Sequence, residues 1–291
     1  MSGDWRDPDA AWWAKAGRAR QHILDLGRQV LAFDPGSAYE VVPESRPDTG
    51  DGAHIIDLRL RVLRKPPTEM LTTIGDALHN MRSCLDSIAF ELATRHTGGS
   101  MTDKQERAIQ FPICETSDDF EEFLDDKRRQ PLFGPVERKA LRCVQPFSFS
   151  EEAAQHGVTW PTPAAVEYMF NPLHRLSQLN NLDKHRYLPL IAWHFEYAFL
   201  RGEQADLTLR TSREAPVSDG GIMGAATWSG TGPDPVARLT IKMGMTLADD
   251  PGGATGLLGA LESWHGNLTG WIVPRIFLVA AGNEPPIMIT A

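Results

Sequence analysis

Cysteine is scarce in this 291-residue chain, and the three cysteines that occur exclude the common cysteine chemistries. Cys84, Cys114 and Cys143 are odd in number and far apart, and no two of them form a Cys-x-x-Cys pair. A disulfide framework needs an even set, and a zinc knuckle needs such pairs. We therefore expect neither.

Long apolar runs are missing as well. The N-terminus is acidic and has no apolar segment of the kind that forms the centre of a signal peptide. The longest apolar run near the C-terminus, residues 271–281, contains Pro274 and Arg275 and is too short to span a bilayer. We expect a soluble, cytoplasmic protein that has no membrane partner.

Excess positive charge and the standard cofactor motifs are also absent. The 29 Lys and Arg residues face 38 Asp and Glu residues, so the net charge is −9 and the chain is a poor general binder of nucleic acid. A local basic site is still compatible with this balance. The sequence has no P-loop, GxGxxG, GxSxG or HExxH motif. We expect no cofactor and no metal ion.

What the sequence does contain is apolar periodicity. Residues 12–33 and 71–97 carry apolar side chains at alternating spacings of three and four, which predicts two long amphipathic helices. Residues 38–64 are β-branched and partly alternating around a loop rich in Pro, Asp and Gly, which predicts a β-hairpin.

The rest of the chain mixes shorter helices and strands. After residue 97 we expect a linker over 98–112, an acidic amphipathic stretch with a solvated face over 118–126, a short helix over 136–144 and a loop over 148–163. A further helix is expected over 171–187, followed by strands over 193–199, 206–211, 225–229 and 237–245. The last helix is expected over 257–271, and Pro274 should kink or break it. This order favours an α+β fold, a helical bundle core packed with a small antiparallel β-sheet. We expect a single interleaved domain over 1–291, whose helical part (about 66–188) is flanked by the hairpin and by residues 189–291.

Two short polar segments are the main functional signal. The first polar segment, residues 79–86, reads His-Asn-Met-Arg-Ser-Cys-Leu-Asp, and the second polar segment, residues 183–186, reads Asp-Lys-His-Arg. Both lie in stretches that otherwise have the pattern of a core helix. Because buried charge must be paired, each segment predicts either a structural network or a site.

In the first polar segment, His79, Arg82 and Asp86 lie within about 60° of one another on the flank of the apolar seam. Arg82 and Asp86 are four residues apart, so they can pair on the helix surface. Three interpretations are open here. The first is an internal salt-bridge network that fixes helix register, the second is a pocket wall shared with the second polar segment, and the third is plain exposure to solvent.

The second polar segment falls in the last turn of its expected helix. The helix dipole favours cations there, which alone accounts for Lys184. Asp183 and Arg186 bracket His185, and the pKa of a histidine lies near neutrality. We therefore take His185 as a candidate acid or base, and Asp183 and Arg186 as candidate binding residues.

Four ordered blocks of the sequence resemble a widespread family of bacterial proteins. The blocks are GDALHNMRSCLD at 75–86, FPI at 111–113, QPF at 145–147 and LDKHR at 182–186. They are similar to the GDALHNLRSALDH, FPI, LQP and DKHR blocks of that family, and the similarity runs from about Pro66 to Pro189. The family has no established activity, so the resemblance implies no particular reaction.

The helical block is also distantly similar to HEPN domains, helical modules that include ribonucleases of toxin and antiviral systems. Their signature is an arginine followed four to six residues later by a histidine. This sequence has Arg82, but it has Ser87 where the family pattern has histidine. The resemblance implies that Arg82 contacts a phosphate, and that His185 or His79 would have to supply the general acid or base.

Three functions are open. The favoured one is a non-catalytic interaction or regulatory module, whose partner is an unidentified protein or a second copy of the chain, as in a homodimer. The second is a HEPN-like phosphodiesterase directed at RNA or a nucleotide. The third is a small-molecule enzyme with a pocket between helices and sheet. The candidate binding residues are Asn80, Arg82, Asp86, Asp183 and Arg186, and the candidate catalytic residues are His185 and His79.

Overall fold

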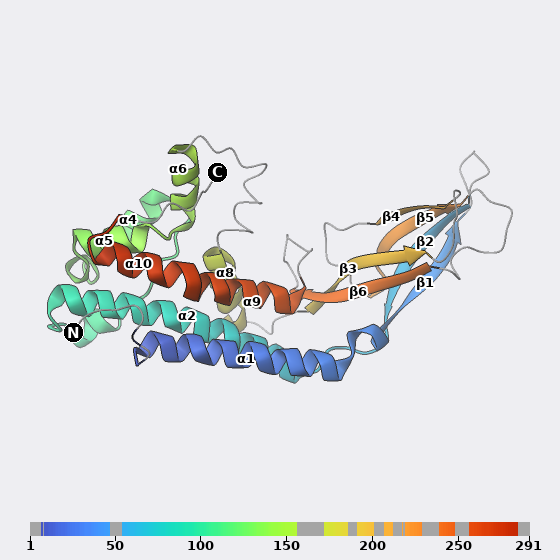
Figure 1. Cartoon of the computed structure of the whole chain (residues 1–291), viewed down its shortest axis with the longest axis horizontal. Helices are drawn as coiled ribbons and strands as arrows, with labels where there is room; N and C mark the ends of the chain where they lie inside the picture. Colours follow the sequence, from blue (N-terminus) through green and yellow to red (C-terminus); the bar gives the residue numbers. More distant parts are fainter. Residues whose placement is uncertain are drawn as a thin grey trace. The chain divides into compact units, whose positions relative to one another are not determined.

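The fold combines a helical core with small antiparallel sheets, as a computed structural model shows (Figure 1). It describes residues 7, 9–46, 54–155, 172–185, 191–200, 207–211, 217, 219–228, 239–247 and 256–284. The predicted α+β class is confirmed. None of the described helices is long and apolar enough to cross a membrane.

The chain divides into two compact units, each built from segments that are far apart in the sequence. Unit 1 comprises Met1–Ile23, Ile74–Tyr187 and Glu262–Ala291, and unit 2 comprises Leu24–Thr73 and Leu188–Leu261. The single interleaved domain expected over 1–291 stays a prediction.

The two long helices form where the apolar periodicity places them. α1 spans Ala11–Phe33 and α2 spans Thr68–Thr97. The apolar side chains that recur at spacings of three and four are buried, except those of Val30 and Leu71, which are half-buried. α1 stops where the sequence predicts, because Asp34 adopts a left-handed conformation with φ 49° and the 3₁₀ turn η1 (Pro35–Ser37) follows.

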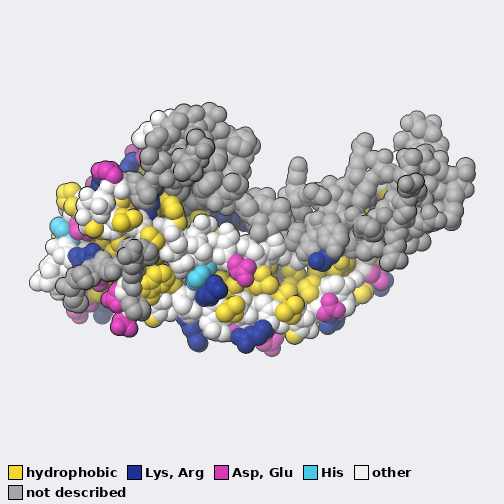
Figure 2. Space-filling view, viewed as in Figure 1, with side chains coloured by type: hydrophobic (Ala, Val, Ile, Leu, Met, Phe, Trp, Pro, Cys, Tyr) yellow, Lys and Arg dark blue, Asp and Glu magenta, His cyan; other side chains and the backbone are white. Residues whose placement is uncertain are grey.

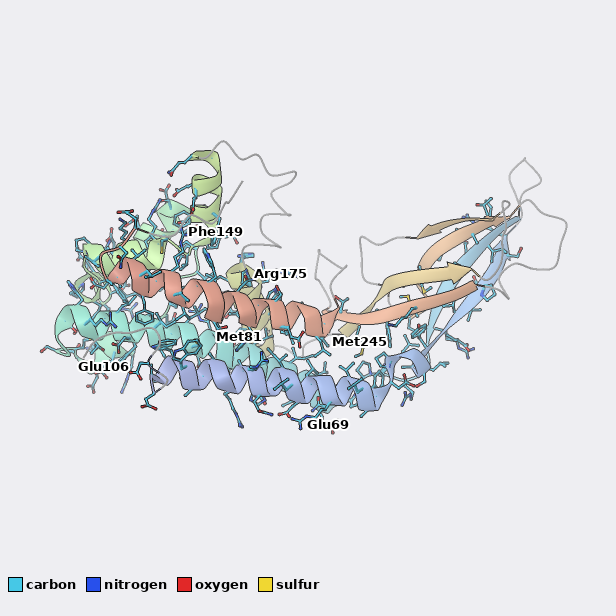
Figure 3. All side chains as sticks on the ribbon, viewed as in Figure 1. Glu69, Met81, Glu106, Phe149, Arg175 and Met245 are labelled. Atoms are coloured by element: carbon cyan, nitrogen blue, oxygen red, sulfur yellow. The ribbon has the colours of Figure 1, made fainter. Side chains whose placement is uncertain are left out.

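Shorter helices complete unit 1: α3 (Asp103–Glu106), α4 (Ser117–Asp125), α5 (Pro135–Arg142), α6 (Pro146–Gln155) and α8 (Pro172–His185). The loop predicted from residue 148 onward is wrong for residues 148–155, which belong to α6. Pro146 begins this helix with a preset φ, and Phe149 is buried with its ring centroid 4.9 Å from that of Trp271 (Figure 3). Aromatic burial therefore outweighs the weak helix propensity of its serines.

The C-terminal helix also differs from its prediction. α9 (Leu257–Asn267) continues through a π-helical turn, η4 (Leu268–Ile272), into α10 (Val273–Ala280). Pro274 does not end the helix. The Val273 N–H donates to the Leu268 carbonyl five residues back, and such a widened turn is one way in which a helix accommodates a residue without an N–H.

Unit 2 contains two antiparallel sheets. The larger has the order β1-β2-β5-β4, with β1 (Tyr39–Arg46), β2 (His54–Val62), β5 (Ile222–Trp228) and β4 (Leu207–Thr211); the smaller pairs β3 (Ile191–Leu200) with β6 (Leu239–Leu247). The predicted hairpin is β1 and β2. Ile56, Leu58 and Leu60 are buried, whereas Arg61 pairs with Glu40 across the strands at 2.8 Å, so β2 has one apolar and one charged face.

The smaller sheet has an irregular register. The pairing of β3 with β6 shifts between Phe195 and Tyr197, which marks a β-bulge. Close to this shift the Met243 N–H donates to the hydroxyl of Tyr39 at 2.9 Å. Trp193 on β3 is buried, whereas the side chains of residues 194–200 lie outside the described residues.

Candidate functional site

The first polar segment binds a stretch of main chain. On α2, Arg82 Nη2 lies 3.1 Å from Asp86 Oδ1, as the spacing predicts. The same Arg82 nitrogen donates to the Phe111 carbonyl at 2.7 Å, and the Phe111 N–H donates to Asp86 Oδ1 at 2.9 Å. Two side chains of one helix thus satisfy both polar groups of one peptide residue, much as a neighbouring β-strand would.

Gln145, which lies between α5 and α6, continues this arrangement. Its side chain is fully buried. Its Oε1 accepts from the Cys114 N–H at 3.0 Å, and its Nε2 donates to the carbonyls of Pro112 at 3.0 Å and Leu141 at 2.9 Å. We call Arg82, Asp86 and Gln145 the backbone clamp, because together they hold residues 111–114.

The backbone clamp joins three of the sequence blocks. Residues 75–86, 111–113 and 145–147 supply its two ends and the chain that it holds. Arg82 is 15% exposed in its side chain and Asp86 is 37% exposed. The network interpretation therefore accounts for both charges without any ligand.

The other predicted residues of α2 lie outside the backbone clamp. His79 is exposed. Asn80 donates from Nδ2 to the Asp76 carbonyl one turn back at 2.8 Å. Ser87, where the related pattern has histidine, donates to the Ser83 carbonyl at 2.9 Å. α2 therefore brings Arg82 and Asp86 together but gives neither His79 nor Asn80 a place beside them.

The second polar segment ends α8. Asp183 and His185 belong to this helix, which stops close to the predicted position. Their side chains, and the whole of Arg186, lie outside the described residues. The expected meeting of the two polar segments stays a prediction.

Unit 1 also contains a buried ion pair that the sequence pattern did not predict. Arg275 on α10 is 3% exposed, and its Nη2 lies 2.6 Å from Glu152 Oε2 on α6. Its Nε donates to the Cys143 carbonyl at 3.0 Å, and its guanidinium lies over the ring of Trp271. Arg275 stood out in the sequence only as a charge inside an apolar run.

Two histidines are likewise structural. His265 is buried, and its Nε2 donates to the Ala16 carbonyl at 2.9 Å; burial lowers the pKa of this imidazole. His96 Nδ1 lies 3.4 Å from Glu137 Oε2 and packs against Gly134, where a Cβ would come within 2.5 Å of the ring. A side chain at residue 134 would require the His96 ring to move.

The acidic stretch before residue 126 is exposed, as predicted, but it is also paired. Arg138 on α5 lies 2.9 Å from Asp125 and 3.4 Å from Glu121. Asp126 pairs with Arg128, whose hydrogen bonds lower the pKa of that carboxyl to about 2. On the face in Figure 2, the described Lys and Arg side chains are interspersed with Asp and Glu and form no continuous basic area.

The cysteines offer no reactive thiol. Burial raises the pKa of Cys84 to about 12 and those of Cys114 and Cys143 to about 11. A thiol with so high a pKa stays protonated, so it is a poor nucleophile and a poor metal ligand. Within the described ranges, no three His, Cys, Asp or Glu side chains gather in a way that could hold a metal ion.

Unit 2 contains a cavity of about 380 Å³ between the end of α1, strand β6 and the start of α9. Its lining residues are Val30, Asp34, Pro35, Gly36, Lys242, Met243, Gly244, Met245, Gly256, Leu257, Leu258 and Gly259. No polar motif marks it in the sequence. The only sequence feature near it is the group of glycines that precedes residue 257.

Comparisons with known proteins identified no relative of this chain. No protein-family model, no curated protein and no solved structure matches the chain.

Proposed function

We propose that this protein is a non-catalytic interaction or regulatory module, and that its first polar segment is structural rather than catalytic. The backbone clamp is the observation that carries this proposal. Arg82 contacts Asp86 and the Phe111 carbonyl, and Asp86 also accepts from the Phe111 N–H. These groups are already matched to one another and to the chain.

A phosphodiesterase would need the opposite arrangement. Its arginine must direct its donors at a phosphate, and a base must lie within hydrogen-bond reach of the attacking hydroxyl. Arg82 directs a donor at a carbonyl of its own chain, His79 is exposed on α2, and Ser87 bonds to its own helix. The net charge of −9 also disfavours RNA as the partner.

The test combines an RNA-cleavage assay with melting curves. Wild type, Arg82→Ala, His79→Ala and His185→Ala are each incubated with mixed RNA, with and without divalent metal ions. We expect no cleavage by any of them, a lower Tm for Arg82→Ala and an unchanged Tm for His79→Ala. Cleavage by wild type that His185→Ala abolishes without lowering Tm would replace this proposal with the phosphodiesterase.

A gain-of-function variant tests the same point from the other side. Ser87→His restores the histidine of the related pattern five residues after Arg82. Because Arg82 stays in the backbone clamp, we expect this variant to remain inactive on RNA while keeping its fold. RNA cleavage by Ser87→His would mean that the clamp leaves Arg82 available to phosphate.

The partner is proposed to be another protein or a second copy of the chain. Sedimentation of the purified protein over a range of concentrations separates these two, because a homodimer dissociates on dilution by mass action. A monomer at all concentrations directs the search to a different protein.

A further inference from the structure

The edge of β6 that lines the cavity in unit 2 carries main-chain groups directed away from its partner strand. Trp193 on β3 and Val217 exchange two main-chain hydrogen bonds, at 3.3 and 2.6 Å, so the peptide groups of Trp193 point away from β6. In the register of β3 with β6, Trp193 is opposite Met245 (Figure 1). The two members of such an antiparallel pair both direct their N–H and carbonyl away from each other. Those of Met245 therefore face the outer edge of β6.

Met243 gives an independent check of this direction. Its N–H donates to the hydroxyl of Tyr39, which lies outside the β3–β6 pair. Because main-chain groups alternate along an antiparallel strand, Met243 and Met245 share one direction, and Gly244 between them is directed at β3. All three residues line the cavity (Met245 is labelled in Figure 3). The cavity therefore lies along the outer edge of β6.

Three of these edge groups are buried without a partner among the described residues. Met243 is 1% exposed and Met245 is 5% exposed. Within the described part of the chain, the Met243 N–H is bonded to Tyr39, whereas the Met243 carbonyl and the Met245 N–H and carbonyl have no partner. Buried main-chain groups are almost always paired. Two acceptors with a donor between them, along one strand edge, match the groups that a neighbouring strand presents.

The rest of the cavity suits the side chain of such a strand. Gly244 has no side chain, so a partner residue opposite it has room in the cavity, whose volume is about 380 Å³. Val30, Leu257 and Leu258 also line this space and make it apolar. The charged lining residues are exposed, so they require no opposite charge on the ligand.

We propose that the outer edge of β6 binds an extended segment of a partner protein as an added antiparallel strand. One residue of this segment exchanges both main-chain hydrogen bonds with Met245, and the residue two positions further along donates to the Met243 carbonyl. The apolar side chain between them lies beside Gly244 in the cavity. This inference rests on the proposed function, because it states how an interaction module holds its protein partner.

The main-chain amides of the two methionines report on the added strand. The full chain is labelled isotopically in methionine for NMR, and the signals are assigned with Met243→Leu and Met245→Leu. The probe is the uncharged peptide acetyl-Ser-Thr-Leu-Thr-Ser-amide. Without the probe, the Met245 N–H should exchange with solvent about tenfold faster than the Met243 N–H, because only the latter is bonded. The probe should shift the Met245 signal and slow its exchange to the rate of Met243.

Methylated versions of the probe test the strand pairing itself. N-methylation of either threonine removes a donor that faces the carbonyl of Met245 or Met243. The Kd should then rise about tenfold, the cost of an unpaired buried acceptor. N-methylation of the leucine changes an N–H that points away from β6, so the Kd should change by less than about threefold. Replacing that leucine with serine should raise the Kd about tenfold or more, because apolar burial is lost.

A pair of protein variants tests the same hydrogen bonds from the other side. Met245→Pro removes the N–H that faces the probe but removes no bond to β3, and proline is tolerated at such an edge. Met245→Val is the matched control, because it also loses the methionine side chain but keeps the N–H and suits a strand. We expect Met245→Pro to bind the probe about tenfold more weakly than Met245→Val. If Met245→Pro lowers the Tm, the methylated probes decide the question on the wild-type protein.

The outcomes separate this inference from the proposed function. Equal protection of the two methionine amides without the probe would show that the chain or a second copy already pairs with the edge, and would overturn the inference. A Met245 signal that does not respond to millimolar probe, or equal Kd values for the threonine-methylated and leucine-methylated probes, would overturn it as well. None of these results affects the RNA assay. RNA cleavage that depends on His185 would overturn the proposed function and leave the peptide titrations intact.

Discussion

The backbone clamp of unit 1 and the cavity of unit 2 are built in opposite ways, the first from polar side chains and the second mainly from apolar side chains and glycines. In the clamp, each charged or amide side chain forms a hydrogen bond with a main-chain group of the same protein, and the Gln145 side chain is fully buried. The cavity is lined mostly by glycines and by Val, Pro, Met and Leu side chains, and its two charged lining residues, Asp34 and Lys242, are exposed.

The difference shows that charge within an apolar helical sequence does not by itself indicate a site. The first polar segment was the conspicuous feature of the sequence, yet its partner is the main chain of Phe111. The cavity has no conspicuous sequence feature, because main chain and glycine form much of it. In the clamp the chain itself supplies the matching groups, as it does for most buried polar side chains.

The largest expected effect comes from the buried ion pair of unit 1. Glu152→Ala leaves the guanidinium of Arg275, which is 3% exposed, without its carboxylate, and should lower the free energy of unfolding by about 3–5 kcal/mol. The adjacent Glu151 is the matched control. It pairs with Arg142 at the surface, so Glu151→Ala should change stability by less than about 1 kcal/mol. Urea denaturation measures both, and equal midpoints would show that the pair is solvated.

The next largest effect tests the centre of the backbone clamp. Gln145→Leu keeps the approximate shape of the side chain but leaves the Cys114 N–H and two carbonyls without a partner. We expect a loss of about 2–3 kcal/mol, the cost of unsatisfied buried groups. Gln130→Leu, at an exposed position, provides the control in thermal melts. A Gln145→Leu melt that overlays wild type would remove the glutamine from the clamp.

Much of the fold could be predicted from the sequence, because α1, α2 and the hairpin each repeat one simple period. α6 could not, since its serines and glutamates read as a loop and its stability comes from burying Phe149. The π-helical turn before Pro274 has no sequence signature of its own.

The candidate site was predictable only in part. The spacing of Arg82 and Asp86 predicts their ion pair, which is confirmed. Their common partner, Phe111, lies 29 residues from Arg82, and a bond to main chain requires no particular side chain there. The sequence therefore predicts the paired side chains of such a network but not the main-chain groups that they bind.

A smaller effect is expected at the exposed edge of the backbone clamp. Asp86→Ala removes the acceptor of the Phe111 N–H, but water reaches a carboxylate that is 37% exposed. We expect a loss of about 1–2 kcal/mol, against almost none for the exposed Glu122→Ala. Differential scanning calorimetry compares the two variants. Equal melting temperatures would place the first polar segment in solvent and withdraw its structural role.

A similar loss of stability is expected in unit 2. Tyr39→Phe removes the hydroxyl that accepts from the Met243 N–H. Met243 is 1% exposed, so the loss of this acceptor should cost about 1 kcal/mol. Urea denaturation measures the difference, and a midpoint equal to that of wild type would show that the Met243 N–H does not depend on Tyr39.

The smallest expected effect is a pH dependence that belongs to unit 1. Burial lowers the pKa of His265 below its ordinary value of 6.5, so between the two values the unfolded chain binds more protons than the folded chain. The contribution of His265 is therefore fully present above pH 6.5 and is lost as the pH falls through the lowered pKa. His265→Gln keeps a donor for the Ala16 carbonyl but does not titrate. Melting curves from pH 8 downward should show wild type losing stability below pH 6.5 more steeply than His265→Gln. Parallel pH profiles would show that His265 accepts a proton in the folded protein as readily as in the unfolded chain, in conflict with its burial.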